Sequence, residues 1–220
     1  MYRVKEVFLT LQGEGALAGR VAVFCRFSRC NLWTGREVDR HRAVCQFCDT
    51  DFVGTDGQNG GEFATARALA AHVAAFWPGV ERSGDSPLVV CTGGEPLLQL
   101  DPDLIEAFHD QGLSVAVETN GTLPAPEDID WLCVSPKAGT RIVIAACDEL
   151  KLVFPQEGQD PADYEWISAS ERFIAPMASP HAHGDRDLLR DANTRSAIDY
   201  CLRHPRWRLS VQMHKMVGID

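Results

Sequence analysis

Two continuously apolar runs constrain the fold of this 220-residue chain most strongly. Leu88–Cys91 and Val115–Val117 contain no polar residue, which is typical of strands buried on both faces of a parallel sheet. Six further runs are rich in β-branched and aromatic residues, so we expect eight strands in all. The expected strands are Val4–Leu11, Arg20–Phe27, Pro87–Thr92, Ser114–Thr119, Trp131–Ser135, Glu149–Phe154, Arg172–Pro176 and Trp207–Gln212.

Three segments between these runs have helical patterns. Glu62–Trp77 carries an apolar stripe and is followed by Pro78-Gly79, while Asp101–Gln111 begins with a capping Asp and a Pro. The third is Asp187–His204. Alternating strands and helices predict an α/β fold. A complete eight-fold barrel needs roughly 250 residues. We therefore expect a partial, TIM-like barrel in a single domain over residues 1–220, with surface loops at 54–61 and 176–184.

The charge balance limits the possible partners. The chain has 21 Lys plus Arg and 31 Asp plus Glu, a formal charge of −10. This argues against a general nucleic-acid or anionic-membrane surface, since both need clustered cations. The longest apolar run, Ile142–Cys147, is six residues, and the first residues lack the apolar region of a secretory signal. We expect a cytoplasmic protein whose cysteines are not in disulfides.

Three of the eight cysteines are grouped. Cys30, Cys45 and Cys48 have the spacing C-x14-C-x2-C, and thiolates are natural ligands for soft metals and iron–sulfur clusters. The residues alone leave three readings open: unrelated thiols, a zinc site with His41 as fourth ligand, or an iron–sulfur cluster with one iron free for a small molecule. The other cysteines are expected to be structural: Cys25, Cys91, Cys133, Cys147 and Cys201.

Polar residues follow three neighbouring strand runs. Thr92–Pro96 reads TGGEP, Glu118–Gly121 reads ETNG and Val134–Lys137 reads VSPK. Each could be a plain turn. However, the carboxyl ends of parallel strands meet at one edge, where α/β proteins bind ligands. The three strand ends together predict one binding site, with glycines that allow close backbone approach and Glu95 suited to an ammonium group.

The three-cysteine motif followed by GGEP and ETNG resembles the radical S-adenosylmethionine (SAM) enzymes. The usual spacing in those enzymes is C-x3-C-x2-C, and this chain carries an 11-residue insertion between the first two cysteines. The finer similarity is to the 7-carboxy-7-deazaguanine synthase family and covers nearly the whole chain. It is carried by LQGEG at 11–15, FCRF at 24–27, CDT at 48–50, SPK at 135–137, ELK at 149–151 and QMHK at 212–215.

The resemblance implies a shortened, partial barrel and a reaction. A [4Fe–4S] cluster on Cys30, Cys45 and Cys48 would chelate SAM, and one-electron reduction would give a 5′-deoxyadenosyl radical. That radical would take hydrogen from C6 of 6-carboxy-5,6,7,8-tetrahydropterin. Ring contraction with loss of ammonia would give 7-carboxy-7-deazaguanine and re-form SAM. Mg²⁺, a homodimer and an electron donor such as a flavodoxin belong to the same expectation, and the product serves queuosine and 7-deazapurine biosynthesis.

The resemblance also implies site residues. Glu14 and Arg26 are expected to take part in catalysis with the cysteines, Arg26 as a fork for the substrate carboxylate, and Thr50 is expected to bind Mg²⁺. The residues expected to bind SAM are Phe47, Cys48, Asp49, Gly93, Gly94, Glu95, Glu118, Asn120, Ser135, Pro136, Lys137, Ala175, Pro176, Met177 and Ala178. Those expected to bind the substrate are Leu11, Gln12, Gly13, Glu14, Arg26, Thr92, His214 and Asp220.

Two other functions fit parts of the sequence. A radical SAM activase would generate a radical on a partner protein, but the Gln12, Glu14 and Arg26 set favours a small substrate. A zinc-held binding module would need neither GGEP nor ETNG. The chain also departs from the family at Ala175, where Gln is expected, and at Ala178-Ser179, where Asp-Gly is expected.

Overall fold

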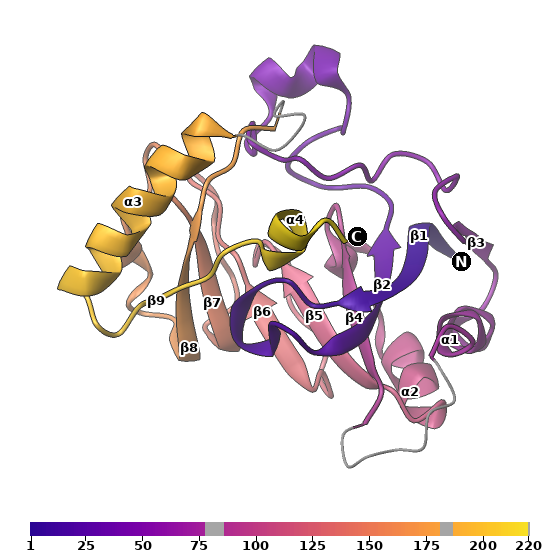
Figure 1. Ribbon diagram of the computed structural model, residues 1–220. Helices are drawn as coiled ribbons and strands as arrows, with labels where there is room; N and C mark the ends of the chain where they lie inside the picture. The colour runs from indigo at the N-terminus through magenta and orange to yellow at the C-terminus, as the bar shows by residue number, and fades with distance from the viewer. Residues whose placement is uncertain (78–85, 181–186, 220) are drawn as a thin grey trace.

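The computed structural model describes residues 1–77, 86–180 and 187–219. These residues form a mixed α/β fold around one nine-stranded sheet with the order β3-β1-β2-β4-β5-β6-β7-β8-β9 (Figure 1). Because β3 and β9 are its two edges, the sheet is not closed. The strands are β1 (Tyr2–Leu11), β2 (Val21–Phe27), β3 (Gly61–Phe63), β4 (Leu88–Gly93), β5 (Ser114–Thr119), β6 (Trp131–Val134), β7 (Ala146–Phe154), β8 (Ser168–Pro176) and β9 (Arg208–Leu209).

The sheet is antiparallel at one edge and parallel elsewhere. β1 pairs antiparallel with β2 and with β3, whereas every neighbouring pair from β2 to β9 is parallel. The run from β2 to β8 therefore brings its carboxyl ends to a single edge. The predicted α/β class is confirmed, and so is the prediction that the apolar runs in β4 and β5 lie in a parallel sheet buried on both faces.

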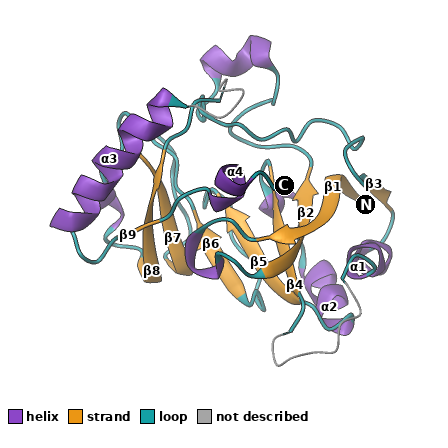
Figure 2. Cartoon of the chain, viewed as in Figure 1, coloured by secondary structure: helices purple, strands orange, loops and turns teal. Residues whose placement is uncertain are grey.

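Four α-helices lie in the described residues (Figure 2): α1 (Ala66–Ala74), α2 (Pro102–Asp110), α3 (Leu188–Arg203) and α4 (Met213–Val217). Thr65, Asp101 and Asp187 cap the first three, each accepting a hydrogen bond from a backbone N–H three residues on. The predicted helix over Glu62–Trp77 begins later than expected, because Gly61–Phe63 pairs with β1 instead. Its predicted stop, Pro78-Gly79, lies outside the described residues.

Two apolar cores hold the helices to the sheet. Leu69 and Val73 of α1 and Leu104 and Phe108 of α2 are fully buried against β1, β2, β4 and β5. Ala197 of α3 packs with residues of β7 and β8 in a second cluster. Burial of apolar surface at about 25 cal/mol per Å² makes these clusters the main source of stability. Among the described residues, no helix has both the length and the apolar character needed to cross a bilayer.

Two connecting segments differ from the sequence prediction. The 54–61 segment, expected to be a flexible surface loop, is hydrogen-bonded along β1: Gly57 N donates to Lys5 O (3.0 Å) and Val7 N to Gln58 O (2.8 Å). The strand expected over Trp207–Gln212 is reduced to β9, because the chain then turns away from the sheet. In Figure 1 the segment from β9 to α4 passes over the sheet near the segment after β1, where Met213 N donates to Gly13 O (3.0 Å).

Candidate active site

Two adjoining pockets lie at the carboxyl edge of the parallel strands. The first, here called the cysteine pocket, is lined by the segment 30–52 and by the ends of β4 to β8. The second, the strand pocket, is lined by side chains of β1 and β2 and by the C-terminal segment. Six residues belong to the walls of both pockets: Glu14, Asp49, Thr50, Thr92, Glu118 and Gln212.

The three grouped cysteines meet in the cysteine pocket. Cys30, Cys45 and Cys48 are free thiols that line it together. A hydrogen bond with Cys45 lowers the pKa of Cys48 to about 7, which favours its thiolate. Within the described ranges, no three side chains of His, Cys, Asp and Glu converge on a position for a single metal ion. His41, the candidate fourth zinc ligand, is exposed and absent from the pocket wall. The donor set suits a thiolate-bound iron–sulfur cluster.

The insertion between Cys30 and Cys45 folds back onto the second cysteine turn. It contains a short 3₁₀ helix, Glu37–Arg42. From this helix Arg40 donates to Gln46 O (2.7 Å) and Cys48 O (2.8 Å), and its guanidinium lies 4.2 Å from the centre of the Trp33 ring. The insertion therefore braces the Cys45–Cys48 turn, a role that the sequence pattern alone did not indicate.

The paired glycines are required by the protein's own packing. A Cβ on Gly94 would lie 2.0 Å from Arg29 O and 2.9 Å from Cys30 Cβ, and Gly93 has φ +131° against Phe27. Hydrogen bonds from Gly94 N to Phe27 O (3.2 Å) and from Glu95 N to Arg29 O (2.9 Å) complete the contact. The end of β4 thus holds the Cys30 segment in place. Gly93 and Gly94, which are predicted to bind SAM, also line the cysteine pocket.

Glu95 does not line either pocket, contrary to its predicted position. It is 0% exposed and accepts hydrogen bonds from Leu97 N (3.0 Å), Thr119 Oγ1 (2.7 Å) and Asn120 N (2.8 Å). Its carboxylate therefore ties the end of β4 to the end of β5. Three donors in a buried site explain why an acidic side chain is placed there.

The ends of β5 and β6 also contribute residues to the cysteine pocket. Glu118, Asn120, Ser135 and Lys137 all line the cysteine pocket. Asn120 Nδ2 donates to Asn31 Oδ1 (2.9 Å), which joins the ETNG turn to the segment after Cys30. The pocket wall also includes six further residues that are predicted to bind SAM: Phe47, Cys48, Asp49, Ala175, Pro176 and Ala178. Pro136 and Met177, which are predicted to bind SAM as well, are not on this wall.

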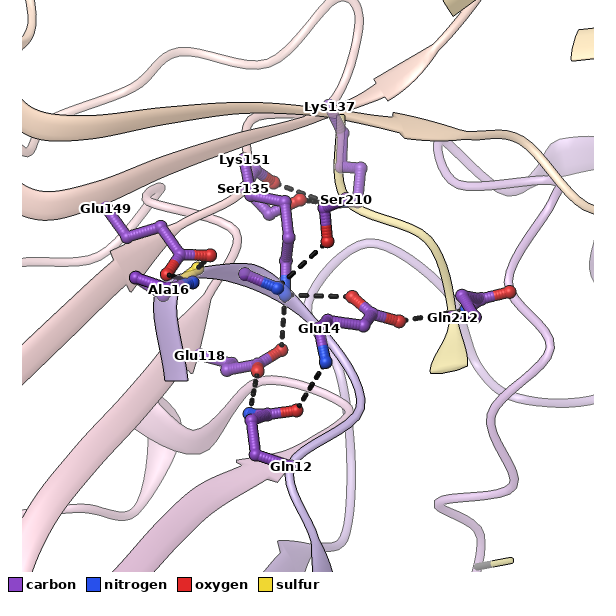
Figure 3. Close-up of polar contacts among 12 residues, drawn as sticks. Gln12, Glu14, Ala16, Glu118, Ser135, Lys137, Glu149, Lys151, Ser210 and Gln212 are labelled. Atoms are coloured by element: carbon purple, nitrogen blue, oxygen red, sulfur yellow. Dashed lines mark hydrogen bonds and ion pairs between the residues drawn. The ribbon is translucent and has the colours of Figure 1, made fainter. Parts of the chain in front are cut away.

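Glu14 is held in a polar network on the wall shared by the pockets (Figure 3). Lys151 Nζ lies 2.9 Å from Glu14 Oε2 and 3.2 Å from Glu118 Oε2, and Gln212 Nε2 donates to Glu14 Oε1 (3.0 Å). Burial by itself raises the pKa of Glu14, but Lys151, Gln212 and His214 together lower it to about 2. Glu14 is therefore ionised and acts as a hydrogen-bond acceptor at neutral pH.

Arg26 lies in the strand pocket with most of the predicted substrate residues. Its Nε donates to Glu6 Oε1 (2.7 Å), and its guanidinium lies 5.9 Å from the centre of the Phe8 ring. Leu11, Gln12, Gly13, Thr92 and His214 line the same pocket. The predicted substrate residue Asp220 lies outside the described residues.

Helix α4 closes one side of the strand pocket. His214 packs so tightly on Gly13 that a Cβ there would lie 2.2 Å from His214 Nδ1. Burial lowers the pKa of His214, which favours its neutral form. Lys215 forms an ion pair with Asp49, beside Cys48. The C-terminal segment is thereby joined to both the LQGEG turn and the cysteine turn.

Comparison with known proteins gives a consistent result. No protein-family model matches the chain. The 7-carboxy-7-deazaguanine synthases of Caulobacter vibrioides and Burkholderia multivorans are 58% and 56% identical to it, each over 99% of both chains. This chain belongs to the 7-carboxy-7-deazaguanine synthase family. The synthase of Bacteroides thetaiotaomicron is 39% identical over 100% of this chain. The predicted family, and with it the assignment as a radical SAM enzyme, is confirmed.

A solved structure of QueE from Escherichia coli matches the fold. It has a TM-score of 0.66 and 23% identity, and the match covers 97% of this chain and 94% of that one. At this level of identity the match concerns the arrangement of the elements alone. It agrees with the open α/β sheet described above.

Sequence reasoning did not identify several residues of the pocket walls. Lys151 is the most prominent, since a lysine inside the apolar run of β7 is a signal of a buried charge that needs partners. Lys215 lies within the QMHK motif but was given no role. The aromatic backing of the cysteine pocket, Trp33 and Phe52, carries no sequence pattern that separates it from an ordinary core.

Proposed function

We propose that this chain converts 6-carboxy-5,6,7,8-tetrahydropterin to 7-carboxy-7-deazaguanine with loss of ammonia. The observation that carries the proposal is the pair of adjoining pockets with a common wall. One pocket contains three thiols and the other contains polar side chains suited to a nitrogen-rich ring with a carboxylate. A cofactor and a substrate in these pockets would be neighbours, as hydrogen transfer between them requires.

We assign the cysteine pocket to a [4Fe–4S] cluster on Cys30, Cys45 and Cys48 and to SAM. When bound, these groups supply a carbon-centred radical that can remove a hydrogen atom from the substrate. The chain's own residues bind and orient them. The backbone of Gly93 and Gly94 would face the methionine end of SAM, the backbone of Phe47 its adenine, and Asn120, Ser135 and Lys137 its ribose or carboxylate. Glu118, which lines both pockets, would face the substrate rather than SAM. Ala175 offers only backbone groups.

We assign the strand pocket to the substrate. At the edge of the pterin ring, the Gln12 amide would accept and donate hydrogen bonds, and the ionised Glu14 would accept them. Arg26, held at Nε by Glu6, has its two terminal nitrogens available on the same guanidinium to bind the substrate carboxylate. Leu11, Gly13, Thr92 and His214 would complete the wall, and Asp220 is proposed as a further contact.

Thr50 is proposed as the protein ligand of Mg²⁺. It lies on the wall that both pockets share, and Asp49 and Asp51 are its neighbours in the sequence. Mg²⁺ takes oxygen ligands and commonly keeps several waters, so a single hydroxyl with substrate oxygens is a suitable set. A cation there would lie near the substrate carboxylate.

The remaining parts of the proposal concern the whole protein. We propose a single domain with a partial, TIM-like barrel, supported by the continuous sheet and by the parallel run from β2 to β9. The family resemblance supports a cytoplasmic homodimer that receives electrons from a donor such as a flavodoxin.

The test is anaerobic turnover of the reconstituted full chain. Incubation with 6-carboxytetrahydropterin, SAM, Mg²⁺ and dithionite is expected to give 7-carboxy-7-deazaguanine, detected by mass spectrometry. Cys45→Ala is expected to lose cluster iron and product, while Cys201→Ala, a half-buried helix cysteine outside both pockets, keeps both. Absence of product from wild-type protein that binds about four irons per chain would overturn the proposed function.

A further inference from the structure

Lys151 lies at the centre of the polar network and has no assigned role. It is 5% exposed, in the middle of β7. Its two carboxylate partners come from distant parts of the chain, Glu14 from the turn after β1 and Glu118 from near the end of β5 (Figure 3). All three line the cysteine pocket, and both carboxylates also line the strand pocket.

The two carboxylates are held in matching ways. Lys151 contacts the Oε2 atom of each, at 2.9 Å for Glu14 and 3.2 Å for Glu118. An amide donates to the Oε1 atom of each: Gln212 Nε2 to Glu14 (3.0 Å) and Gln12 Nε2 to Glu118 (2.9 Å). Two carboxylates that share one cation would repel each other if the cation were removed. The ammonium group therefore holds the two carboxylates together and fixes their orientation.

The other titratable groups in contact with this network do not replace the ammonium. Burial raises the pKa of both Cys133 on β6 and Glu149 on β7, which favours their neutral forms. Burial lowers the pKa of His214 on α4, which faces Glu14. Burial also acts to lower the pKa of Lys151, but the surrounding acidic groups outweigh it and leave the pKa raised. Lys151 is therefore the cation of this network.

We propose that Lys151 is a positioning residue that holds the Glu14 and Glu118 carboxylates together and aligned as paired hydrogen-bond acceptors, and so selects a ligand edge rich in N–H donors. This inference rests on the proposed function, because the amino-pyrimidine edge of a tetrahydropterin presents such donors. A protonated carboxyl at either position would offer an O–H donor to the ligand's N–H and lose the hydrogen bond.

Lys151→Met tests this role. Without the ammonium, one of the two carboxyls is expected to hold a proton near neutral pH. We expect KM for the pterin to rise by about tenfold or more at pH 7, as for loss of one hydrogen bond to a charged group. KM should recover as the pH is raised and the second carboxyl ionises, while kcat changes less. Lys151→Arg should restore part of the affinity.

A second measurement does not depend on turnover. Infrared difference spectra between pH 6 and pH 9 should show an additional protonated-carboxyl band in Lys151→Met, beyond any band of Glu149, that is absent from wild type and from Lys151→Met/Glu118→Gln. Lys5→Met is the matched control, because Lys5 is also buried between two carboxylates, Asp51 and Asp56. It should lose stability without a pH-dependent KM.

The outcomes separate the two proposals. A wild-type KM in Lys151→Met, or a fall in kcat alone, would overturn the role of Lys151, as would infrared spectra without the new band. If wild type makes no product, the proposed function fails, but the infrared spectra still decide the role of Lys151. If Lys151→Met does not fold, the double variant with one carboxylate fewer should fold and have a KM independent of pH. A pH-dependent KM in it would overturn the role.

Discussion

Glu14 and Glu95 show how the surroundings of a side chain decide its role. Glu14 is half-buried and Glu95 is fully buried, and both belong to motifs singled out in the sequence, LQGEG and GGEP. Glu14 is balanced by a lysine and keeps access to a pocket, whereas Glu95 is enclosed by three N–H and O–H donors. Each motif predicts that an acidic side chain is needed. Neither motif predicts the direction of that side chain, because the direction depends on residues from neighbouring strands.

Gly94→Ala is expected to disturb the cysteine segment. The added Cβ would meet backbone atoms of Arg29, which cannot move aside as a side chain can. We expect a loss of about 1–3 kcal/mol in the free energy of unfolding, measured by urea denaturation. Reconstituted protein should also bind less iron.

Gly61→Ala is the matched control, because its Cβ would lie 3.7 Å from the nearest atom, in ordinary contact with Phe63. It should keep its iron and most of its stability. Equal stability and iron content in the two variants would contradict the packing explanation of the GG pair.

At the level of elements, periodicity and capping residues locate most of the fold. Apolar runs predict the long strands, and Asp101 and Asp187 predict the starts of α2 and α3. The shorter elements β3, β9 and α4 were missed or misjudged. A strand of two or three residues, or a single helical turn, is stabilised by its tertiary contacts and leaves little periodic signal in the sequence.

The cap of α3 makes a contribution to stability that depends on pH. Asp187 accepts hydrogen bonds from Arg190 N (3.0 Å) and Ser179 N (2.8 Å). Burial acts to raise the pKa of Asp187, but these bonds outweigh it and lower the pKa. The contribution is therefore complete above the unfolded-state pKa of about 3.9 and is lost as pH falls through the folded-state value.

Asp187→Ala should accordingly cost about 0.5–2 kcal/mol at pH 7, and its difference from wild type should narrow below pH 4. Urea denaturation at several pH values measures this difference. Asp187→Asn keeps the acceptor oxygen and should cost less at pH 7. A gap between wild type and Asp187→Ala that stays constant down to pH 2.5 would show that the carboxylate charge is not involved.

At the scale of the whole molecule, the site is assembled from both ends of the sequence. Local motifs indicated the cysteines and the strand-end residues because each motif lies within a short stretch of the sequence. They could not predict that Lys151 of β7 meets Glu14, or that Lys215 meets Asp49, since these contacts join segments more than 100 residues apart and depend on the path of the chain.

Removing the C-terminal segment should impair the strand pocket but leave the cysteine pocket able to bind iron. A chain ending at Val211 keeps the sheet, the cysteines and α3 but lacks Gln212, His214 and Lys215. We expect cooperative thermal unfolding and iron binding to remain, with product formation reduced by about 100-fold or more as substrate contacts are lost. Met216→Ala, a change at an exposed side chain on α4, should retain activity. Product formation within a few-fold of wild type by the shortened chain would refute this role of α4.

The six residues common to both pocket walls have a thermodynamic consequence. A ligand in one pocket that moves these shared residues will strengthen or weaken ligand binding in the other pocket, and this coupling is reciprocal. The factor by which one small molecule changes the dissociation constant of the second must equal the factor measured in the opposite order of addition. Calorimetric titrations of each ligand, with and without the other, would therefore give the same cooperativity constant.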